Sequence, residues 1–565
     1  MPKYLLPLCA IISVFTCLEA KNPPRKAVQA RHGMVVSAEG LASRVGRDIL
    51  KKGGNAVDAA VATGFALAVT FPQAGNIGGG GYMVIRMASG KTTTFDFREK
   101  APGKATRDMY LDSTGRFVSA GSEHGYLSVG VPGSVAGLLD ALAKYGTMKR
   151  EQVLAPAIAL AERGFPVGAG MARVMKEKID AFNCYGGTKR TFTRKGKPYR
   201  RGEIFVQKDL AETLKRIASR GKEGFYRGKT ARLIVQEMKL GGGLITLEDL
   251  KNYAAIERPP VTGTYRGYEI VSMGPSSSGG IILIELLNML ERYDVAAGGF
   301  GTPHTIALMA ETMKFAYADR AEYLGDEDFY PVPIATLISK DYAASRAALI
   351  DTAKAAPAST IAHGIIPHVE GVHTTHYSVV DRWGNAVSTT TTINSWFGSG
   401  VVVSGAGFFL NNEMDDFSAK PGTPNQFGLI GGVANAIQPN KRMLSAMTPT
   451  IVLKDQKPVL VVGSPGGSTI ITTVLQVILN VIDHRMNVQD AVNAMRVHDQ
   501  WYPDSLYYEH ESLRPRVIDE LKSRGYATAE RAGNQGEVEA IAVDGKKKML
   551  YGAADPRGHG TAAGY

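Results

Sequence analysis

The stretch GVHTTHYSVVDRWGNAVSTTTT, residues 371–392, decides the fold. Thr375 to Val380 consists mainly of strand-forming Thr, Tyr and Val, residues 381–385 are typical of a turn, and Ala386 to Ile393 indicates a returning strand. The residues before this stretch contain Gly, Pro and scattered His, which indicates a loop. Thr374 therefore lies where a loop meets the first strand of a predicted hairpin.

A cut before Thr374 would give this residue a free α-amine beside its hydroxyl. A hydroxyl is a weak nucleophile without an adjacent base, and an N-terminal amine is such a base. Thr is also common at the start of ordinary strands, so the Thr pair alone is a weak signal. The hypothesis of an N-terminal nucleophile therefore depends on the motifs that accompany it.

Further motifs follow one another along the chain. They are GMVVSAEGLAS (33–43), FDFREKAP (95–102), LNNEMDDFSAKPG (410–422), PNKRMLSAMTPTI (439–451), GSPGGS (463–468) and DPRGHGTAAGY (555–565). Their order and wording resemble the gamma-glutamyltransferases (gamma-glutamyltranspeptidases) of bacterial type. These are members of the N-terminal-nucleophile hydrolase superfamily that cleave themselves to expose a Thr. The resemblance covers nearly the whole mature chain, and several motifs in order are more specific than any one alone.

The coarse pattern of elements is compatible with that family's fold, an α+β four-layer αββα sandwich. Helices and antiparallel hairpins in both halves of the chain favour an α+β or layered fold over a parallel βαβ series. Helices are expected at residues 55–70, 134–145, 155–163, 281–293, 304–323 and 468–483, and hairpins at 82–98, 375–393, 450–462 and 538–552.

Two further segments are interpreted locally. Gly78 to Gly81 predicts a turn with unusual backbone angles, since no Gly-Lys-Ser/Thr follows as in a phosphate-binding loop. Lys189 to Arg201 is basic and contains Gly, and it predicts a solvated excursion.

The resemblance implies autocleavage between His373 and Thr374. The products would be a large subunit of residues 21–373 and a small catalytic subunit of residues 374–565, which stay associated because both build one shared structural domain. Thr374 would then be the nucleophile, and the hydroxyl of Thr392 would contact it. On the pattern alone, Thr392 is equally typical of a solvent-facing strand residue.

Gly466 and Gly467 match the family's pair of backbone amides that bind the tetrahedral oxyanion. Gly suits such a turn because the backbone must approach the substrate closely. One oxyanion donor typically contributes about 10²–10³ in rate. A plain strand-to-helix turn is the other interpretation of these residues, and the two do not exclude each other.

The resemblance also assigns the residues that hold a free glutamyl head group. Arg98 and Ser445 match the positions that bind the α-carboxylate, and Asn394, Glu413 and Asp416 match those that accept from the α-ammonium. A lone Arg after a strand is otherwise typical of a solvated surface. Beside Asp416, Asp415 is expected to be the more exposed carboxyl.

The chain departs from the family pattern at two positions. Ala446 stands where the family has a second Ser on the carboxylate. Residues 424–440 resemble the lid loop of bacterial members, and Phe427 occupies a position where some of them have a gating Tyr. Each change removes one hydroxyl.

The composition excludes some functions. A chain of 565 residues, 44% hydrophobic and 21% charged, can bury a large core. Its net charge is +12, but it has no long Lys/Arg run and no basic-aromatic interleaving, so nucleic-acid binding is not expected. The His residues at 363, 368, 373 and 376 fit no standard zinc spacing, and no metal or other cofactor is expected.

Residues 1–20 predict a secretory signal peptide, with an uncleaved anchor as the alternative. Cys9 and Cys17 would leave with it, so the remaining Cys184 allows no internal disulfide. The protein is therefore expected to be periplasmic or secreted, without stable membrane insertion.

The expected activity is that of a self-processing gamma-glutamyl hydrolase/transpeptidase. It would cleave glutathione and other gamma-glutamyl compounds through a gamma-glutamyl-Thr ester, with water, an amino acid or a dipeptide as the acceptor. One alternative is an acylase or poly-gamma-glutamate depolymerase of the same superfamily. Another is a catalytically impaired secreted binding homologue, which Ala446 favours slightly and the intact Thr374, Thr392 and Gly-Gly pair oppose.

Overall fold

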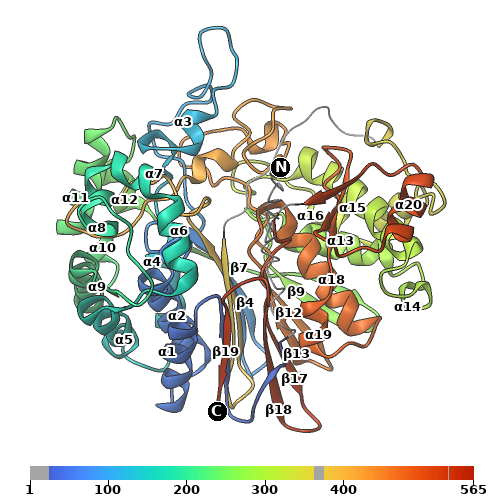
Figure 1. Ribbon diagram of the computed structural model, residues 1–565, viewed down its shortest axis with the longest axis horizontal. Coiled ribbons are helices and arrows are strands. Elements are labelled where there is room, and N and C mark those ends of the chain that lie inside the picture. Colours follow the sequence, from blue (N-terminus) through green and yellow to red (C-terminus); the bar gives the residue numbers. More distant parts are fainter. Residues whose placement is uncertain (1–24, 362–373, 532) are drawn as a thin grey trace, which may run out of the picture.

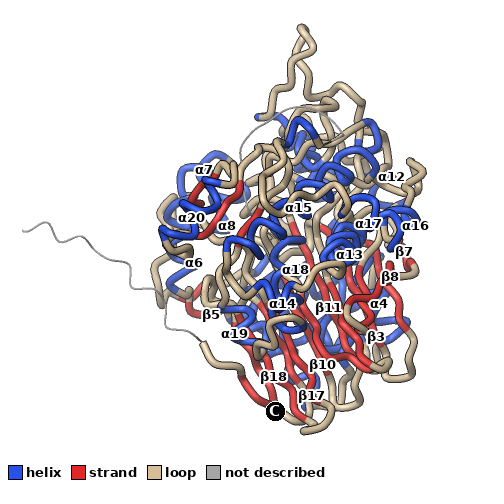
Figure 2. The backbone as a smooth tube through the Cα atoms, turned by 90° about the vertical axis from the view of Figure 1, so that its right-hand side faces the viewer, coloured by secondary structure: helices blue, strands red, loops and turns tan. Residues whose placement is uncertain are grey.

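The computed structural model describes residues 25–361, 374–531 and 533–565. Two seven-stranded antiparallel sheets stack face to face at its centre, and helices cover both outer faces (Figure 1). Figure 2 shows the strands running together through the lower half, while loops gather at the upper end. The four layers confirm the predicted αββα sandwich.

Sheet I contains the hairpin that follows Thr374. Its strands, in spatial order, are β19 (Thr561–Gly564), β2 (Met34–Ser37), β10 (Thr375–Val380), β11 (Ala386–Thr392), β3 (Gly80–Arg86), β4 (Thr92–Asp96) and β7 (Ile256–Arg258). Sheet II has the order β1 (Val28–Ala30), β18 (Met549–Ala554), β17 (Glu539–Asp544), β13 (Lys457–Val462), β12 (Thr450–Lys454), β9 (Tyr268–Ser272) and β8 (Val261–Tyr265). Strands from before and after Thr374 pair with each other in both sheets, so neither part of the chain forms a sheet alone.

The helices outside sheet I come from the first half of the chain. They are α1 (Gly40–Lys51), α2 (Ala56–Thr70) and α4 (Ser134–Tyr145), with α5 (Arg150–Arg163), α9 (Lys208–Arg220) and α11 (Gly228–Leu240) farther out and shorter ones at α3 (Ala120–Glu123), α6 (Ala169–Glu177), α7 (Ile179–Cys184), α8 (Gly186–Phe192), α10 (Glu223–Tyr226) and α12 (Leu247–Asn252). Every residue of α2 is buried, which explains why its apolar residues run all round the helix. Asn55 and Asp58 form a capping box that fixes where α2 begins.

The helices outside sheet II come from the parts of the chain before and after Thr374. They are α13 (Gly279–Leu290), α15 (Pro303–Tyr323), α18 (Ile470–Ile482) and α19 (Val488–Asn493), with α14 (Val295–Gly298), α16 (Ile334–Leu337), α17 (Lys340–Ala347) and α20 (Pro515–Ser523) around them. Two small sheets complete the fold, β14 (Val497–His498) with β15 (Leu506–Glu509) and β16 (Thr528–Arg531), and β5 (Phe165–Pro166) with β6 (Ile204–Phe205). Apolar side chains such as Met34, Val380, Ile451 and Val461 fill the space between the two large sheets.

One local prediction is wrong, and a second is wrong in part. None of the residues Gly78 to Gly81 has a positive φ angle. They are needed for close packing instead, because a Cβ on Gly79 would lie 2.1 Å from the carbonyl oxygen of Thr392, and one on Gly78 would lie 2.0 Å from that of Phe409. The basic segment 189–201 is not a fully solvated excursion, because its first residues end α8 and bury Phe192 in an aromatic cluster.

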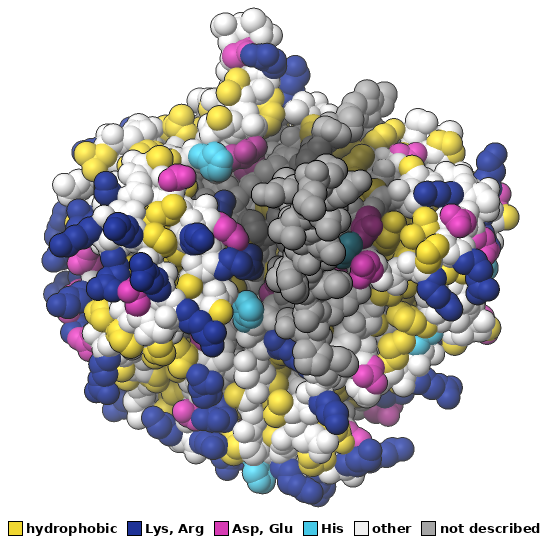
Figure 3. All heavy atoms as spheres, in the orientation of Figure 1, with side chains coloured by type: hydrophobic (Ala, Val, Ile, Leu, Met, Phe, Trp, Pro, Cys, Tyr) yellow, Lys and Arg dark blue, Asp and Glu magenta, His cyan; other side chains and the backbone are white. Residues whose placement is uncertain are grey.

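Several predictions fall outside the described residues. These are the signal peptide at 1–20 and the residues His363, His368 and His373, so the cleavage site is described only from Thr374 onward. In the described parts of the chain, no helix has the length and apolar character that crossing a membrane requires. On the face drawn in Figure 3, basic side chains are scattered along the left and lower margins among acidic ones.

Candidate active site

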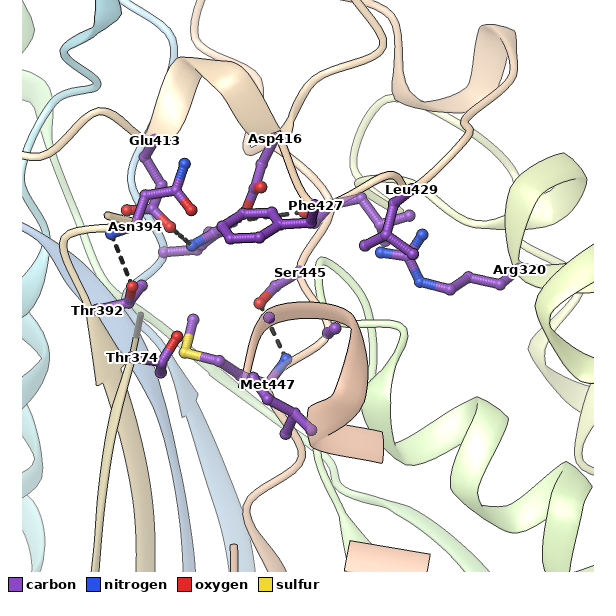
Figure 4. A pocket seen from close by; sticks show the side chains of 15 residues that line it. Arg320, Thr374, Thr392, Asn394, Glu413, Asp416, Phe427, Leu429, Ser445 and Met447 are labelled. Atoms are coloured by element: carbon purple, nitrogen blue, oxygen red, sulfur yellow. Dashed lines mark hydrogen bonds and ion pairs between the residues drawn. The ribbon is translucent and has the colours of Figure 1, made fainter. Parts of the chain in front are cut away.

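One pocket at the upper ends of the sheets brings together nearly all of the site residues predicted from the sequence (Figure 4). It is small, about 20 Å³. Its lining comprises Arg98, Arg320, Thr374, Thr392, Asn394, Glu413, Asp416, Phe427, Leu429, Leu444, Ser445, Ala446, Met447, Gly467 and Ile470. Gly466 is adjacent in the chain to Gly467, and His373 lies outside the described residues.

The central hairpin of sheet I positions the two Thr residues. Thr374 immediately precedes β10, and Thr392 ends β11. Because the two strands are antiparallel neighbours, both residues lie at the same end of the hairpin. Both side chains are buried, which rules out the solvent-facing interpretation of Thr392. The Oγ1 atom of Thr392 accepts a hydrogen bond of 2.7 Å from the backbone amide of Asn394, whose positive φ of 69° turns the chain into the pocket.

The glycine turn approaches the same pocket from sheet II. Gly466 and Gly467 have φ angles of 145° and 54°, in the region that favours Gly. Gly467 begins a short 3₁₀ helix, Gly467–Thr469, which leads directly into α18. The first amides of a helix have no acceptor within it, so this turn can present N–H groups to an anion.

Arg98 is completely buried at the other side of the pocket. Its Nη1 pairs with Glu413 and its Nη2 with Asp416, while Nε donates to the carbonyl oxygen of Met443 at 3.2 Å. Glu99 lies 3.5 Å from Nη1. The sequence predicted these partners as separate binders of a substrate, and here they also bind each other.

Burial decides the protonation of this cluster. It raises the pKa of Glu413 well above the usual range, raises that of Asp416, and raises that of Glu99 to about 7, although Arg98 opposes each shift. Burial alone would lower the pKa of Arg98, but the neighbouring carboxylates hold it well above the ordinary value. One guanidinium thus faces three carboxyl groups, and the cluster favours an additional positive charge.

The expected roles of the two adjacent Asp residues need one correction. Asp415 is the more buried residue, not the more exposed, because its carboxylate accepts hydrogen bonds from Ser122 Oγ at 2.7 Å and from the backbone amide of Gln426 at 3.0 Å. Burial raises the pKa of Asp415 to about 7. Only Asp416 of the pair lines the pocket.

Sequence reasoning missed Arg320, which α15 supplies. Its side chain is buried, its Nε donates to Ser278 Oγ at 2.9 Å, and burial lowers its pKa to about 10. No motif marks this position, since an Arg in the middle of a helical pattern is typical of a surface residue. Leu429 and Met447 also line the pocket; they lie in the segments 424–440 and 439–451 that the sequence singled out, but neither residue was assigned a role.

Phe427 closes the pocket. In Figure 4 the ring lies beside Asp416, with Asn394 on one side of it and Leu429 on the other. The lid is tied to the cluster below, because Asn425 Nδ2 donates to Asp416 Oδ1 at 3.2 Å. Phe427 and Leu429, both lid residues, line this narrow space, so a movement of the lid would change the room that a substrate has.

His376 is the one described member of the His group that the sequence marked. Its ring is buried and bonded to Thr390 Oγ1 at 2.9 Å and Ser378 Oγ at 3.1 Å. Burial lowers its pKa to about 3, so the imidazole is neutral. Within residues 25–361, 374–531 and 533–565, no group of three or more His, Cys, Asp or Glu could hold a metal ion.

Comparison with known proteins places this geometry in a family. The sequence model of the gamma-glutamyltranspeptidase family matches residues 42–565. The chain is 52% identical over 531 residues to the glutathione hydrolase proenzyme of Escherichia coli K12, covering 94% of this chain and 91% of that protein.

Two solved structures extend the comparison. The cephalosporin acylase from Bacillus halodurans superposes with a TM-score of 0.85 at 29% identity, covering 96% of this chain and 97% of the other. A gamma-glutamyltranspeptidase chain from Helicobacter pylori is 50% identical with a TM-score of 0.57, covering 58% of this chain and 94% of its own length. The chain therefore belongs to the gamma-glutamyltranspeptidase family.

Proposed function

We propose that this protein is a self-processing gamma-glutamyl hydrolase and transpeptidase that acts on glutathione and related gamma-glutamyl compounds. The observation that carries the proposal is a single pocket with two chemically different sides. A strand-initial Thr and a Gly-Gly turn form one side, and Arg98 with its carboxyl partners forms the other. That pairing suits an acyl transfer on a substrate with a charged amino-acid head.

Thr374 is proposed as the nucleophile after cleavage of the bond to His373. Its free α-amine, with an ordinary pKa of about 7.7–8.0, takes the hydroxyl proton as Oγ1 attacks the γ-carbonyl carbon. The amides of Gly466 and Gly467 stabilise the oxyanion. The C–N bond then breaks, the ammonium returns the proton to the leaving amine, and a γ-glutamyl ester remains on Oγ1.

The second half of the reaction releases the glutamyl group. Water, or the amine of an amino acid or dipeptide, attacks the ester carbon and loses a proton to the α-amine, and Oγ1 leaves as it takes that proton from the ammonium. Water gives hydrolysis, and an amine gives transpeptidation. Thr392 is proposed to hold the Oγ1 atom of Thr374 in place, because it lies at the adjacent end of the neighbouring strand β11.

The charged side of the pocket is proposed to bind the free glutamyl head. The α-ammonium would lie against Asn394, Glu413 and Asp416, where it adds the positive charge that the three-carboxyl cluster lacks. The α-carboxylate would then share the Arg98 guanidinium with Asp416 and take a hydroxyl donor from Ser445. Salt bridges already tie Arg98 to Glu413 and Asp416, so a substrate meets a preorganised set of charges.

The two cleavage products, residues 21–373 and 374–565, are proposed to remain associated. Both contribute strands to both sheets, so separating them would expose the apolar side chains between the sheets. An exported location, periplasmic or secreted, is proposed from the predicted signal peptide alone.

The direct test incubates the purified protein with a γ-glutamyl anilide, with and without a dipeptide acceptor. A γ-glutamyl anilide should release aniline, and the dipeptide should appear as its γ-glutamyl derivative. No release from the γ-glutamyl anilide by fully cleaved protein would refute the proposal.

The superfamily acylases supply the second candidate function, because an acylase is among the solved structures that match the whole chain. A glutaryl anilide separates the two, since it keeps the scissile amide but lacks the α-ammonium and α-carboxylate. The Arg98 cluster should make it a far poorer substrate than the γ-glutamyl anilide. Preference for the glutaryl compound would favour the acylase.

A further inference from the structure

The segment from His498 to Trp501 carries buried polar side chains that the proposed chemistry does not use. It begins at the last residue of β14 and passes beside the lid. His498, Gln500 and Trp501 are each at most 3% exposed. Polar groups so deeply buried need specific partners, and these partners lie on three different parts of the molecule.

A chain of hydrogen bonds runs from α18 to the lid. Thr472 Oγ1 lies 2.9 Å from His498 Nδ1, and His498 Nε2 lies 2.9 Å from Gln500 Oε1. Gln500 Nε2 then donates to the carbonyl oxygens of Gly428 at 3.2 Å and Phe427 at 3.4 Å. These two carbonyl groups belong to the pocket-lining Phe427 and to the residue directly after it.

The chain has one consistent set of donors. Gln500 must aim its amide nitrogen at the two lid carbonyls, so its oxygen faces the imidazole and His498 carries its proton on Nε2. Nδ1 is then left to accept the single proton of the Thr472 hydroxyl, whose Oγ1 also lies 3.1 Å from the carbonyl oxygen of Thr469. Burial lowers the pKa of His498 to about 3, which keeps the ring neutral and able to accept there.

Two further hydrogen bonds hold the segment His498 to Trp501 in place. Trp501 Nε1 donates to the carbonyl oxygen of Ala358 at 3.0 Å, and Asp499 Oδ1 accepts from the backbone amide of Trp501 at 2.9 Å. Thr472 belongs to α18, the helix that begins directly after the Gly466–Gly467 turn. The same helix therefore carries the glycine turn at its start and supports the lid through Gln500.

We propose that Gln500 is a positioning residue that seats Phe427 over the γ-glutamyl pocket. It thereby sets how firmly the donor is retained and how much of the acyl-enzyme is lost to water. The inference rests on the proposed function for its kinetic consequences. Its structural part, the control of lid opening, stands independently.

Gln500→Ala and Gln500→Glu test the proposal. The Glu side chain has nearly the same shape and can still accept from His498, but it turns an oxygen toward two carbonyl oxygens in place of a donor. The KM for a γ-glutamyl donor should rise about two- to tenfold in Gln500→Ala, the factor that corresponds to one neutral hydrogen bond, and further in Gln500→Glu. The ratio of hydrolysis to transfer should rise, while autocleavage should proceed.

Gln476 provides the matched control. It is another buried Gln beside the segment, since its Nε2 donates at 2.8 Å to the carbonyl oxygen of Val497, the residue before His498. No described lid residue contacts Gln476 through a hydrogen bond. Gln476→Glu should lower the thermal stability without changing the ratio of hydrolysis to transfer. An equal change of that ratio in both variants would mean that Gln500 acts only through general stability, and would overturn the proposal.

Hydrogen–deuterium exchange of the lid amides supplies a readout that needs no activity. In cleaved, folded Gln500→Glu, exchange should accelerate within residues 424–432 and stay unchanged in α18. Unchanged lid exchange would overturn the proposal whatever the kinetics show. If the wild-type protein had no γ-glutamyl activity, the proposed function would fail while this experiment still decided the role of Gln500.

Discussion

The two sides of the pocket are built by opposite means. The nucleophile side rests on the central strands β10 and β11 and on a glycine turn, and its side chains are uncharged hydroxyls. The head-group side rests on Arg98, shortly after β4, and on the short 3₁₀ helix Glu413–Asp416, which buried ion pairs hold together. Position is therefore fixed by backbone geometry on one side and by charge balance on the other. Substitutions should abolish chemistry on the first side and weaken binding on the second.

The sharpest way to break this comparison is Thr374→Ala. The variant should remain one uncut chain and lose activity by about 10⁴-fold or more, as expected when a nucleophile is removed. A denaturing gel and a γ-glutamyl anilide assay measure both effects. Thr375→Ala is the control, because the adjacent Thr375 Oγ1 is buried without a hydrogen-bond partner among the described residues. Loss of cleavage in the control alone would move the cleavage site by one residue.

Arg98→Ala tests the charged side. The KM for γ-glutamyl donors should rise about 100-fold, since hydrogen bonds to a charged group are lost and buried carboxyls are left without their partner. Autocleavage should proceed, because it needs no bound glutamate. Arg98→Lys should restore only part of the affinity, since Lys lacks the planar two-point donor.

Arg442→Ala is the matched control for Arg98. Arg442 is equally buried and pairs with Asp96 at 3.2 Å, but it does not line the pocket. The Arg442→Ala substitution should lower the free energy of unfolding and leave the KM for γ-glutamyl donors unchanged. A KM that stayed constant in Arg98→Ala would remove Arg98 from the substrate site.

The pH profile sharpens the assignment of the base. The α-amine of Thr374 must be neutral to accept a proton, so kcat/KM should fall about tenfold per pH unit below the amine's pKa of about 7.7–8.0. His376 cannot supply this limb, because burial lowers its pKa to about 3. A rate that stayed level down to pH 6 would exclude the amine as the base.

The smallest expected effect concerns Ala446. It is buried and lines the pocket beside Ser445. Ala446→Ser would add a hydroxyl donor near the substrate carboxylate, and should lower KM for glutathione-like donors by up to about tenfold with little change in kcat. Steady-state kinetics measures it, and an unchanged or raised KM would mean that the donor carboxylate is held elsewhere.

The central hairpin and the site motifs could be predicted because their signals are local. The strand over Thr375–Val380 has the predicted bounds, and the motif alone selected Asp416 over Asp415 as a pocket residue. Long-range contacts defeated the rest. Gly79 is glycine because the carbonyl of Thr392 lies against it, and nothing within residues 78–81 reveals that neighbour.

Arg320 and Gln500 show the same limit at the site. Arg320 reaches the pocket because α15 packs beside it, and Gln500 is placed by His498 and by two carbonyl oxygens of the lid. Neither residue stands in a motif whose chemistry could have been interpreted in advance. The sequence patterns indicated the candidate reactive residues, and the packing revealed which residues surround them.

Mass spectrometry of the purified protein, before and after incubation with a γ-glutamyl donor, tests the central claim most directly. The smaller chain should begin at Thr374 and, in samples quenched during turnover, carry one γ-glutamyl group on its first residue. A fully active protein with the peptide bond between His373 and Thr374 intact would contradict the account.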